Sequence, residues 1–341
     1  MITDLVDGKV DASSCIQIGS KAIPLKSISA PVSHPHCPEV SLYPVTYTDT
    51  VSQGHLPKPE IISFASVFEK VRFMNRVLGQ FYEPARPLKL SVMTWNAGCT
   101  RPAHNFPPIV STGPDVDLWV FGMQECLYDP VPPSKTCEAD WLQLVRDALS
   151  STGEFILMTS VSLWQIRIAV FVRVSIRHLV SDVSTSTVAT GFAGIVKNKG
   201  ASAVSMCING AKCLFICSHL AARPERVHQR KVMTADILKG LKLLSPSGSD
   251  LFPEAVFGHI FWFGDLNYRV DLPFEQCITL VEKTDPPVIT PLLETDQLRT
   301  ARFIGDTLAS FHEQTINFTP TYRLEPGTAL YGNKRGQSPS W

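Results

Sequence analysis

The sequence lacks an excess of charge of either sign. Its 341 residues contain 31 Lys and Arg against 31 Asp and Glu, which gives a formal net charge of +0. No summed positive field therefore draws the whole surface to nucleic acid or to an anionic membrane. Any anion-binding site must be local, built from a few residues that the fold brings together.

Long apolar runs and closely spaced cysteine pairs are also missing. No window approaches the roughly 20 apolar residues that cross a bilayer, and charged residues such as Asp4 and Lys9 interrupt the stretch 1–23, where a secretory signal needs an apolar run. The nine cysteines form no Cys-x-x-Cys pair and share no zinc-ligand spacing with His. These absences argue against structural zinc and favour a cytoplasmic protein.

What the sequence does contain is enough apolar material for a large core. Hydrophobic residues make up 44% of the chain and charged residues 18%. Residues 1 to about 60 are rich in Pro, Ser, Thr and His and follow no period, whereas 64–81 shows helical spacing before two prolines end it. We expect an N-terminal extension over 1–87, irregular apart from that helix, and one large folded domain over 88–341.

Within 88–341, runs rich in Val, Ile and Phe alternate with helical patterns. Strands are expected at 88–95, 118–123, 155–158, 163–174, 201–208, 212–218 and 259–263. Helices are expected at 141–149, 226–244, 274–283 and 291–303. Asn209 followed by Gly210 predicts a tight hairpin, because both residues tolerate a positive φ. The pattern indicates a sheet-based α/β core.

Several expected strands end in polar residues suited to a metal or a phosphate. Asn96, Glu125 and Asp265 each follow an apolar run, and His219 follows another. One such residue alone means little, since a strand leaving a core must become polar somewhere. Together they predict one cleft where strand ends converge. Glu125 and Asn96 offer the oxygen ligands that Mg²⁺ prefers.

These residues lie in motifs with a family resemblance. The motifs are Thr94–Asn96, Gln124–Glu125, Asn198–Gly200, Ser218–Ala221 and Trp262–Arg269. Their ordered set resembles the inositol polyphosphate 5-phosphatases, and the last motif is the most specific. The resemblance runs from about Leu88 to Trp341 and implies the endonuclease/exonuclease/phosphatase fold, a two-sheet β-sandwich flanked by helices.

The resemblance also implies chemical roles. Glu125 would be the main Mg²⁺ ligand, with Asn96 beside it, and Asp265 would orient and deprotonate the attacking water. Asn267 would contact the phosphoryl oxygens, and His219 would hold the scissile phosphate. In such phosphoryl transfer, catalysis is mainly positioning plus electrostatic stabilisation, and no covalent intermediate is implied.

A second group would recognise a neighbouring 4-phosphate on the inositol ring. The residues that resemble the family's basic contacts are Lys199, Tyr322, Arg323, Lys334 and Arg335. Arg and Lys suit this task because their hydrogen bonds to phosphate are charge-assisted. Arg323 and Arg335 are equally well explained as solvated surface cations.

The sequence departs from the family pattern at two places. Lys197 stands where the family usually has glycine, which changes the local turn and adds a cation. The chain also stops at Trp341, where the family continues with Cys-Asp-Arg and a later Ser-Asp-His segment. We therefore expect the last core strands to be missing and residues 1–341 to have little phosphatase activity.

Three functions are compatible with these observations. The leading one is Mg²⁺-dependent hydrolysis of the 5-phosphate of phosphoinositide lipids or soluble inositol polyphosphates, with peripheral membrane contact if the substrate is a lipid. The first alternative is a noncatalytic module that binds phosphoinositides. The second is a nuclease of the same fold, which the neutral charge balance disfavours because duplex binders display a broad basic face. No nucleic-acid partner is expected.

Overall fold

The computed structural model describes residues 87–101, 116–133, 135–190, 199–241, 252–284, 286–325, 328–332 and 337–341, together with five short strands before residue 64. The chain divides into two compact units, Met1–Leu88 and Lys89–Trp341. In the first unit, two small antiparallel sheets comprise β1 (Cys15–Ile18), β2 (Lys21–Pro24), β3 (Val32–Ser33), β4 (Glu39–Leu42) and β5 (Glu60–Ser63). The helix expected over 64–81 lies outside the described residues.

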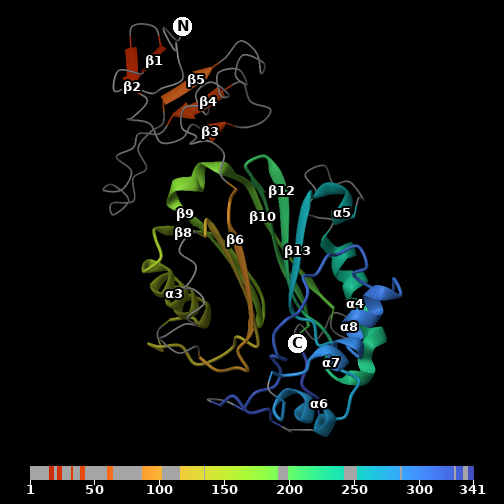
Figure 1. Ribbon diagram of the computed structural model, residues 1–341. Coiled ribbons are helices and arrows are strands. Elements are labelled where there is room, and N and C mark those ends of the chain that lie inside the picture. The colour runs from red at the N-terminus through yellow and green to blue at the C-terminus, as the bar shows by residue number, and fades with distance from the viewer. Residues whose placement is uncertain are drawn as a thin grey trace. The chain divides into compact units, whose positions relative to one another are not determined.

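The second unit contains two four-stranded sheets (Figure 1). In spatial order the first comprises β6 (Leu90–Asn96), β7 (Leu118–Gln124), β9 (Ile166–Arg173) and β8 (Phe155–Leu163). The second comprises β10 (Val180–Ala189), β11 (Gly200–Ile208), β12 (Ala211–His219) and β13 (His259–Asp265). In each sheet one neighbouring pair is parallel, β6 with β7 and β12 with β13.

The two sheets pack face to face, and a glycine sets how closely they approach. A Cβ atom on Gly122 of β7 would lie 2.5 Å from the Phe263 ring and 2.7 Å from the Cys217 sulfur, so a larger residue would push the sheets apart. Gln124 also donates a 3.2 Å hydrogen bond from Nε2 to Cys217 Sγ across the gap. The predicted two-sheet sandwich is thus confirmed.

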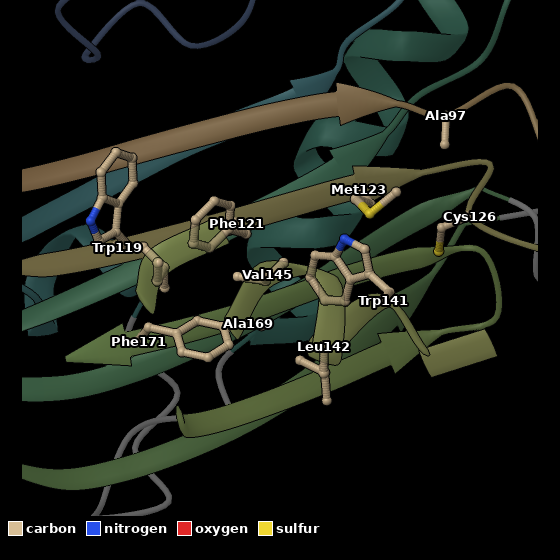
Figure 2. Close-up of a cluster of buried hydrophobic side chains, with 11 residues drawn as sticks. Ala97, Trp119, Phe121, Met123, Cys126, Trp141, Leu142, Val145, Ala169 and Phe171 are labelled. Atoms are coloured by element: carbon tan, nitrogen blue, oxygen red, sulfur yellow. The ribbon is translucent and has the colours of Figure 1, made fainter. Parts of the chain in front are cut away.

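Helices cover the outer faces of this sandwich. On the first sheet, α3 (Cys137–Ser150) buries Trp141 and Val145 against Phe121 and Phe171 (Figure 2). The two phenylalanine rings meet edge to face at 6.0 Å between centroids, and full burial of each such ring stabilises the fold by about 2 kcal/mol. On the second sheet, α4 (Val227–Gly240) and α8 (Gln297–Phe303) contribute the helix side of another core cluster.

The predicted hairpin is confirmed, and one strand was missed. Asn209 and Gly210 both have positive φ, 48° and 82°, and they join β11 to β12. Strand β10 was not expected, because its ten residues contain Ser and Thr at half of their positions and no apolar run. Its pairing with β11 imposes the extended conformation that its composition does not specify.

The helix expected over 291–303 is wrong as a single element. It forms two helices, α7 (Thr290–Glu294) and α8, which are separated because Asp296 caps α8 by accepting a 2.8 Å hydrogen bond from Arg299 N. The remaining described helices include α5 (Pro253–Val256) and α6 (Phe274–Val281). Across the described part of the chain, no helix has the length and apolarity needed to cross a membrane.

Candidate active site

The parallel strand pairs of the two sheets end in polar residues. Asn96 is level with Gln124 at the ends of β6 and β7, and His219 is level with Asp265 at the ends of β12 and β13. The edge strands β6 and β13 contact each other where the sheets meet (Figure 1). Residues from four strands are therefore delivered to one edge of the sandwich.

At this edge the side chains are in direct contact. Asn96 donates a 2.8 Å hydrogen bond from Nδ2 to Asp265 Oδ2, although the two residues are 169 positions apart. His219 Nε2 lies 3.3 Å from the same carboxylate oxygen and 4.0 Å from Glu125 Oε1. The structure thus brings together the four residues that were predicted to meet because each lies at the end of an expected strand. Their chemical roles stay predictions.

Asp265 is held in its ionised form. Burial by itself would raise the pKa of this carboxyl, but hydrogen bonds from His219 and Asn96 and the positive charge of Lys199 outweigh it and lower the pKa to about 2. A carboxylate is therefore present throughout the neutral pH range. It can accept a hydrogen bond from a water molecule without first losing a proton.

Lys199 brings a cation to the same place. It directly precedes β11, and its Nζ contacts His219 Nε2. Burial lowers the pKa of Lys199, while the nearby carboxylates of Asp265 and Glu125 act in the opposite direction. His219 is itself only 3% exposed. The second sheet therefore presents two nitrogen groups and one carboxylate in a closely packed set.

Glu125 differs from this set because its carboxylate is accessible. It directly follows β7 with a φ of 49°, and its side chain is 40% exposed. Cys99 N donates a 2.8 Å hydrogen bond to the Glu125 carbonyl, which joins the loops after β6 and β7. The backbone conformation, uncommon outside glycine, is thus supported by neighbouring loops.

The oxygens of Glu125 and Asn96 fit a hard divalent cation. Asn96 Oδ1 accepts a 3.0 Å hydrogen bond from Gly98 N and keeps a second lone pair. Nowhere in the described ranges do three or more His, Cys, Asp or Glu side chains group closely enough to hold an ion by themselves. A hard cation such as Mg²⁺ needs only one or two protein oxygens because it keeps several waters, and this pair would supply them.

Asn267 sits in the turn after β13, and its side chain is already engaged. Its backbone N donates to Asp265 Oδ1 at 3.1 Å, and its φ is 57°. Its Nδ2 donates to the Leu220 carbonyl at 3.1 Å, and its Oδ1 accepts from Arg269 Nη2 at 2.5 Å. These protein contacts shape the turn carrying Asp265, and the contact of Asn267 with the phosphoryl oxygens stays a prediction.

Arg269 lies near these residues, and no role was predicted for it from the sequence. Only 6% of it is exposed, and its guanidinium carbon lies 4.2 Å from the centroid of the Tyr322 ring. It thereby links Asn267 to Tyr322, whose hydroxyl donates a 2.5 Å hydrogen bond to Gln337 Oε1. Arg269 could have been found from the sequence, because it is the last residue of the most specific motif. It was not considered there as a cation in its own right.

The remaining predicted basic residues are only partly described. Arg323 follows Tyr322 and is half-buried, with its carbonyl accepting a 2.9 Å hydrogen bond from Gly332 N. Lys334, Arg335 and Lys197 lie outside the described residues. The structure therefore places Lys199 among the catalytic candidates and Tyr322 beside Arg269, and leaves the other predicted substrate contacts as predictions.

Comparison with known proteins gives a family match over most of the second unit. A family model described as Endonuclease/Exonuclease/phosphatase family 2 matches residues 93–341. The chain is also 32% identical over 256 residues to phosphatidylinositol 3,4,5-trisphosphate 5-phosphatase 2 of Mus musculus, covering 71% of this chain and 19% of that relative. It thus spans about a fifth of the length of this curated relative.

Solved structures show the same architecture. The inositol polyphosphate 5-phosphatase domain of SPsynaptojanin, in complex with inositol (1,4)-bisphosphate and calcium ion, matches with a TM-score of 0.62 and 25% identity, covering 74% of both chains. A Cimex nitrophorin variant in its ferrous NO complex matches with a TM-score of 0.55 and 20% identity, covering 74% of this chain and 84% of that one. The second likeness shows the fold alone, so function has to be argued from the site.

Proposed function

The chain belongs to the endonuclease/exonuclease/phosphatase family 2, and on that premise we propose that it hydrolyses the 5-phosphate of an inositide with Mg²⁺ as its cofactor. The substrate class is a phosphoinositide lipid or a soluble inositol polyphosphate. The observation that carries the proposal is the meeting of Asn96, Glu125, His219 and Asp265 at the shared edge of both sheets.

Glu125 and Asn96 would hold the divalent ion. When bound, the ion supplies a Lewis acid that stabilises negative charge on the phosphate oxygens. The accessible carboxylate of Glu125 supports this role, because its oxygens face solvent while those of Asp265 are engaged by protein groups. Calcium is present in the related SPsynaptojanin complex, and the preference for Mg²⁺ in this chain is part of the proposal.

Asp265 would orient the attacking water. With a pKa of about 2 it is a weak base, so it holds the water by accepting a hydrogen bond and takes the proton only as the bond to phosphorus forms. Asn96 and His219 both contact Oδ2 of this carboxylate and help to fix its position. Asn267 holds the turn through its own backbone bond to Asp265, and its predicted contact with the phosphoryl oxygens is part of the proposal.

Nitrogen groups around the carboxylates would bind the phosphate groups. Lys199 and His219 lie next to Asp265 and would contact the scissile phosphate. Arg269, stacked on Tyr322, would supply charge for the neighbouring ring phosphate. Binding a multiply phosphorylated ring needs such local charge, because the chain has no net charge to attract it.

A lipid substrate would also require contact with a membrane surface. Leu127 and Val131, which follow Glu125, are 49% and 56% exposed, and Trp164 in the turn between β8 and β9 is 53% exposed. Cys126 N donates to the Gln165 carbonyl at 3.4 Å and ties that turn to the Glu125 segment. We propose that these three side chains form an apolar rim that enters the bilayer interface beside the site.

Phosphate release from a 5-phosphorylated inositide, measured with and without Mg²⁺, tests the function. Release by the wild-type chain should require the ion, and Glu125→Ala or Asp265→Ala should abolish it. Release that survives both substitutions would refute the proposed site. The same measurement on the wild-type chain, residues 1–341, decides the expectation of little activity, which substantial Mg²⁺-dependent release would overturn. Inositide binding without any turnover would favour the noncatalytic alternative.

A further inference from the structure

We propose that Asp140 is a positioning residue for the divalent-ion site, an inference that rests on the proposed function. Asp140 lies in the first turn of α3 and is 2% exposed. Arg101, on the loop after β6, donates to its carboxylate through two hydrogen bonds, Nε to Oδ2 at 2.7 Å and Nη2 to Oδ1 at 2.8 Å. This bidentate pair anchors the loop that follows Asn96.

The same helix turn also holds the loop after Glu125. The backbone of Val131 forms a further hydrogen bond with the Asp140 carboxylate. Cys137 donates a 3.0 Å hydrogen bond from Sγ to the Cys126 carbonyl, and the Tyr128 hydroxyl donates to the Cys137 carbonyl at 3.2 Å. One carboxylate is thus shared by the two loops that carry the candidate metal ligands.

The loops are joined to each other close to those ligands. Ala97 N donates to the Gln124 carbonyl at 2.9 Å, and Cys99 N donates to the Glu125 carbonyl at 2.8 Å. The anchor itself is rigid, because α3 buries Trp141 in the core of the first sheet. The separation and orientation of Asn96 and Glu125 therefore depend on how both loops are held by Asp140.

This arrangement makes a prediction that a purely structural ion pair would not make. Groups that orient metal ligands without touching the metal commonly change metal affinity by about tenfold to a hundredfold when they are removed. Asp140→Asn keeps the shape of the side chain but turns two acceptor oxygens into one acceptor and one donor. It should weaken divalent-ion binding while leaving the phosphate-binding cations in place.

Mn²⁺ binding to the whole chain without substrate, measured by isothermal titration calorimetry, tests this directly. Asp140→Asn should raise the Kd for Mn²⁺ about tenfold, and Arg101→Lys, which keeps the charge but not the fork, about threefold. At saturating metal, kcat should return to within about twofold of wild type with KM for the inositide unchanged. Glu313→Gln is the control, because it breaks the 2.8 Å Arg302–Glu313 pair, in which neither partner belongs to α3 or to the two loops.

The possible outcomes separate this inference from the proposed function. An unchanged Kd in both Asp140→Asn and Arg101→Lys, or a loss of kcat that metal does not restore, would overturn the positioning role. If the wild-type chain releases no phosphate but Asp140→Asn still weakens Mn²⁺ binding, the proposed function fails and the positioning role stands. If the wild-type chain binds no Mn²⁺, both fail.

Discussion

The two strand pairs that meet at the site hold their carboxylates in opposite ways. On the β12–β13 side, Asp265 receives hydrogen bonds from Asn96 and from the Asn267 backbone and lies beside His219. On the β6–β7 side, the Glu125 side chain is 40% exposed, and its Oε1 lies 4.0 Å from His219 Nε2. One carboxylate is fixed by the protein, whereas the other is free to take an external ligand.

This contrast explains how one site can combine rigid and exchangeable parts. Orienting a water molecule requires a group whose position does not change, and a half-buried carboxylate held by several protein hydrogen bonds meets that need. Binding an ion that exchanges with solvent requires accessible oxygens on an anchored backbone. The positive φ of Glu125 and the loop contacts behind it supply that anchor.

Removing the fixed carboxylate should have the largest effect. Asp265→Asn keeps the size of the side chain but removes the negative charge and places a donor group against Asn96 or His219. We expect kcat to fall about a thousandfold, with KM nearly unchanged, because the lost interaction acts in the transition state. Steady-state phosphate release gives both constants, and a fall in kcat below tenfold would contradict the role.

Removing the accessible carboxylate should instead change the metal requirement. In Glu125→Gln one ligand oxygen loses its charge, so we expect the Mg²⁺ concentration for half-maximal rate to rise about a hundredfold. High Mg²⁺ should recover part of the activity, which it should not do for Asp265→Asn. Equal metal dependence in the two variants would erase the distinction between the two sides.

The buried cation beside Tyr322 should affect substrate binding more than turnover. Arg269→Lys keeps a charge but loses the planar stack and the bond to Asn267. We expect KM to rise about tenfold for substrates with a second ring phosphate, and less for those without it. Tyr322→Phe is the matched control, because it keeps the ring and removes only the hydroxyl bond to Gln337.

The apolar rim beside Glu125 should have a smaller effect that depends on the form of the substrate. Trp164→Ala removes the largest exposed side chain of the rim, so we expect vesicle binding and turnover of a lipid inositide to fall about fivefold. Turnover of a soluble inositol polyphosphate should be unchanged. An equal fall for both substrates would place Trp164 in the fold or the catalytic site rather than at a membrane.

The ion pair between Arg101 and Asp140 should make the stability of the fold depend on pH. The hydrogen bonds from Arg101 hold the pKa of Asp140 below its ordinary value of 3.8. Its contribution to folding is therefore complete above about pH 4 and is lost as the pH falls through the folded-state pKa. Urea unfolding should show Asp140→Asn less stable than wild type near pH 7, with a smaller difference at pH 3. A difference that stays constant over this range would argue against the ion pair.

The ends of the strands that carry the site residues could be predicted from the sequence, because each apolar run stops abruptly at a polar residue. It also located the hairpin at Asn209 and Gly210, where local backbone chemistry determines the turn. Strand β10 could not be predicted from the sequence, because its extended form comes from pairing with β11 rather than from its own Ser- and Thr-rich composition. The anchoring of both loops by Asp140 was equally hidden, since it depends on where α3 packs.

The roles of individual site residues were harder to predict than their convergence. Asn267 was expected at the phosphate, which stays a prediction, but the contacts of its amide with Leu220 and Arg269 were not foreseen. Arg269 was part of a recognised motif, but nothing in the motif shows that it stacks on Tyr322, 53 positions later. Such pairings depend on tertiary geometry that spacing along the chain does not encode.

The most direct test of the account is a double-mutant cycle between the two sides of the site. If Glu125 and Asp265 act on one phosphate, the losses of Glu125→Gln and Asp265→Asn should not multiply. The double variant should then be within about tenfold of Asp265→Asn alone in kcat/KM at fixed Mg²⁺. Losses that multiply in full would show that the two carboxylates act independently, which would contradict a single site shared by both sheets.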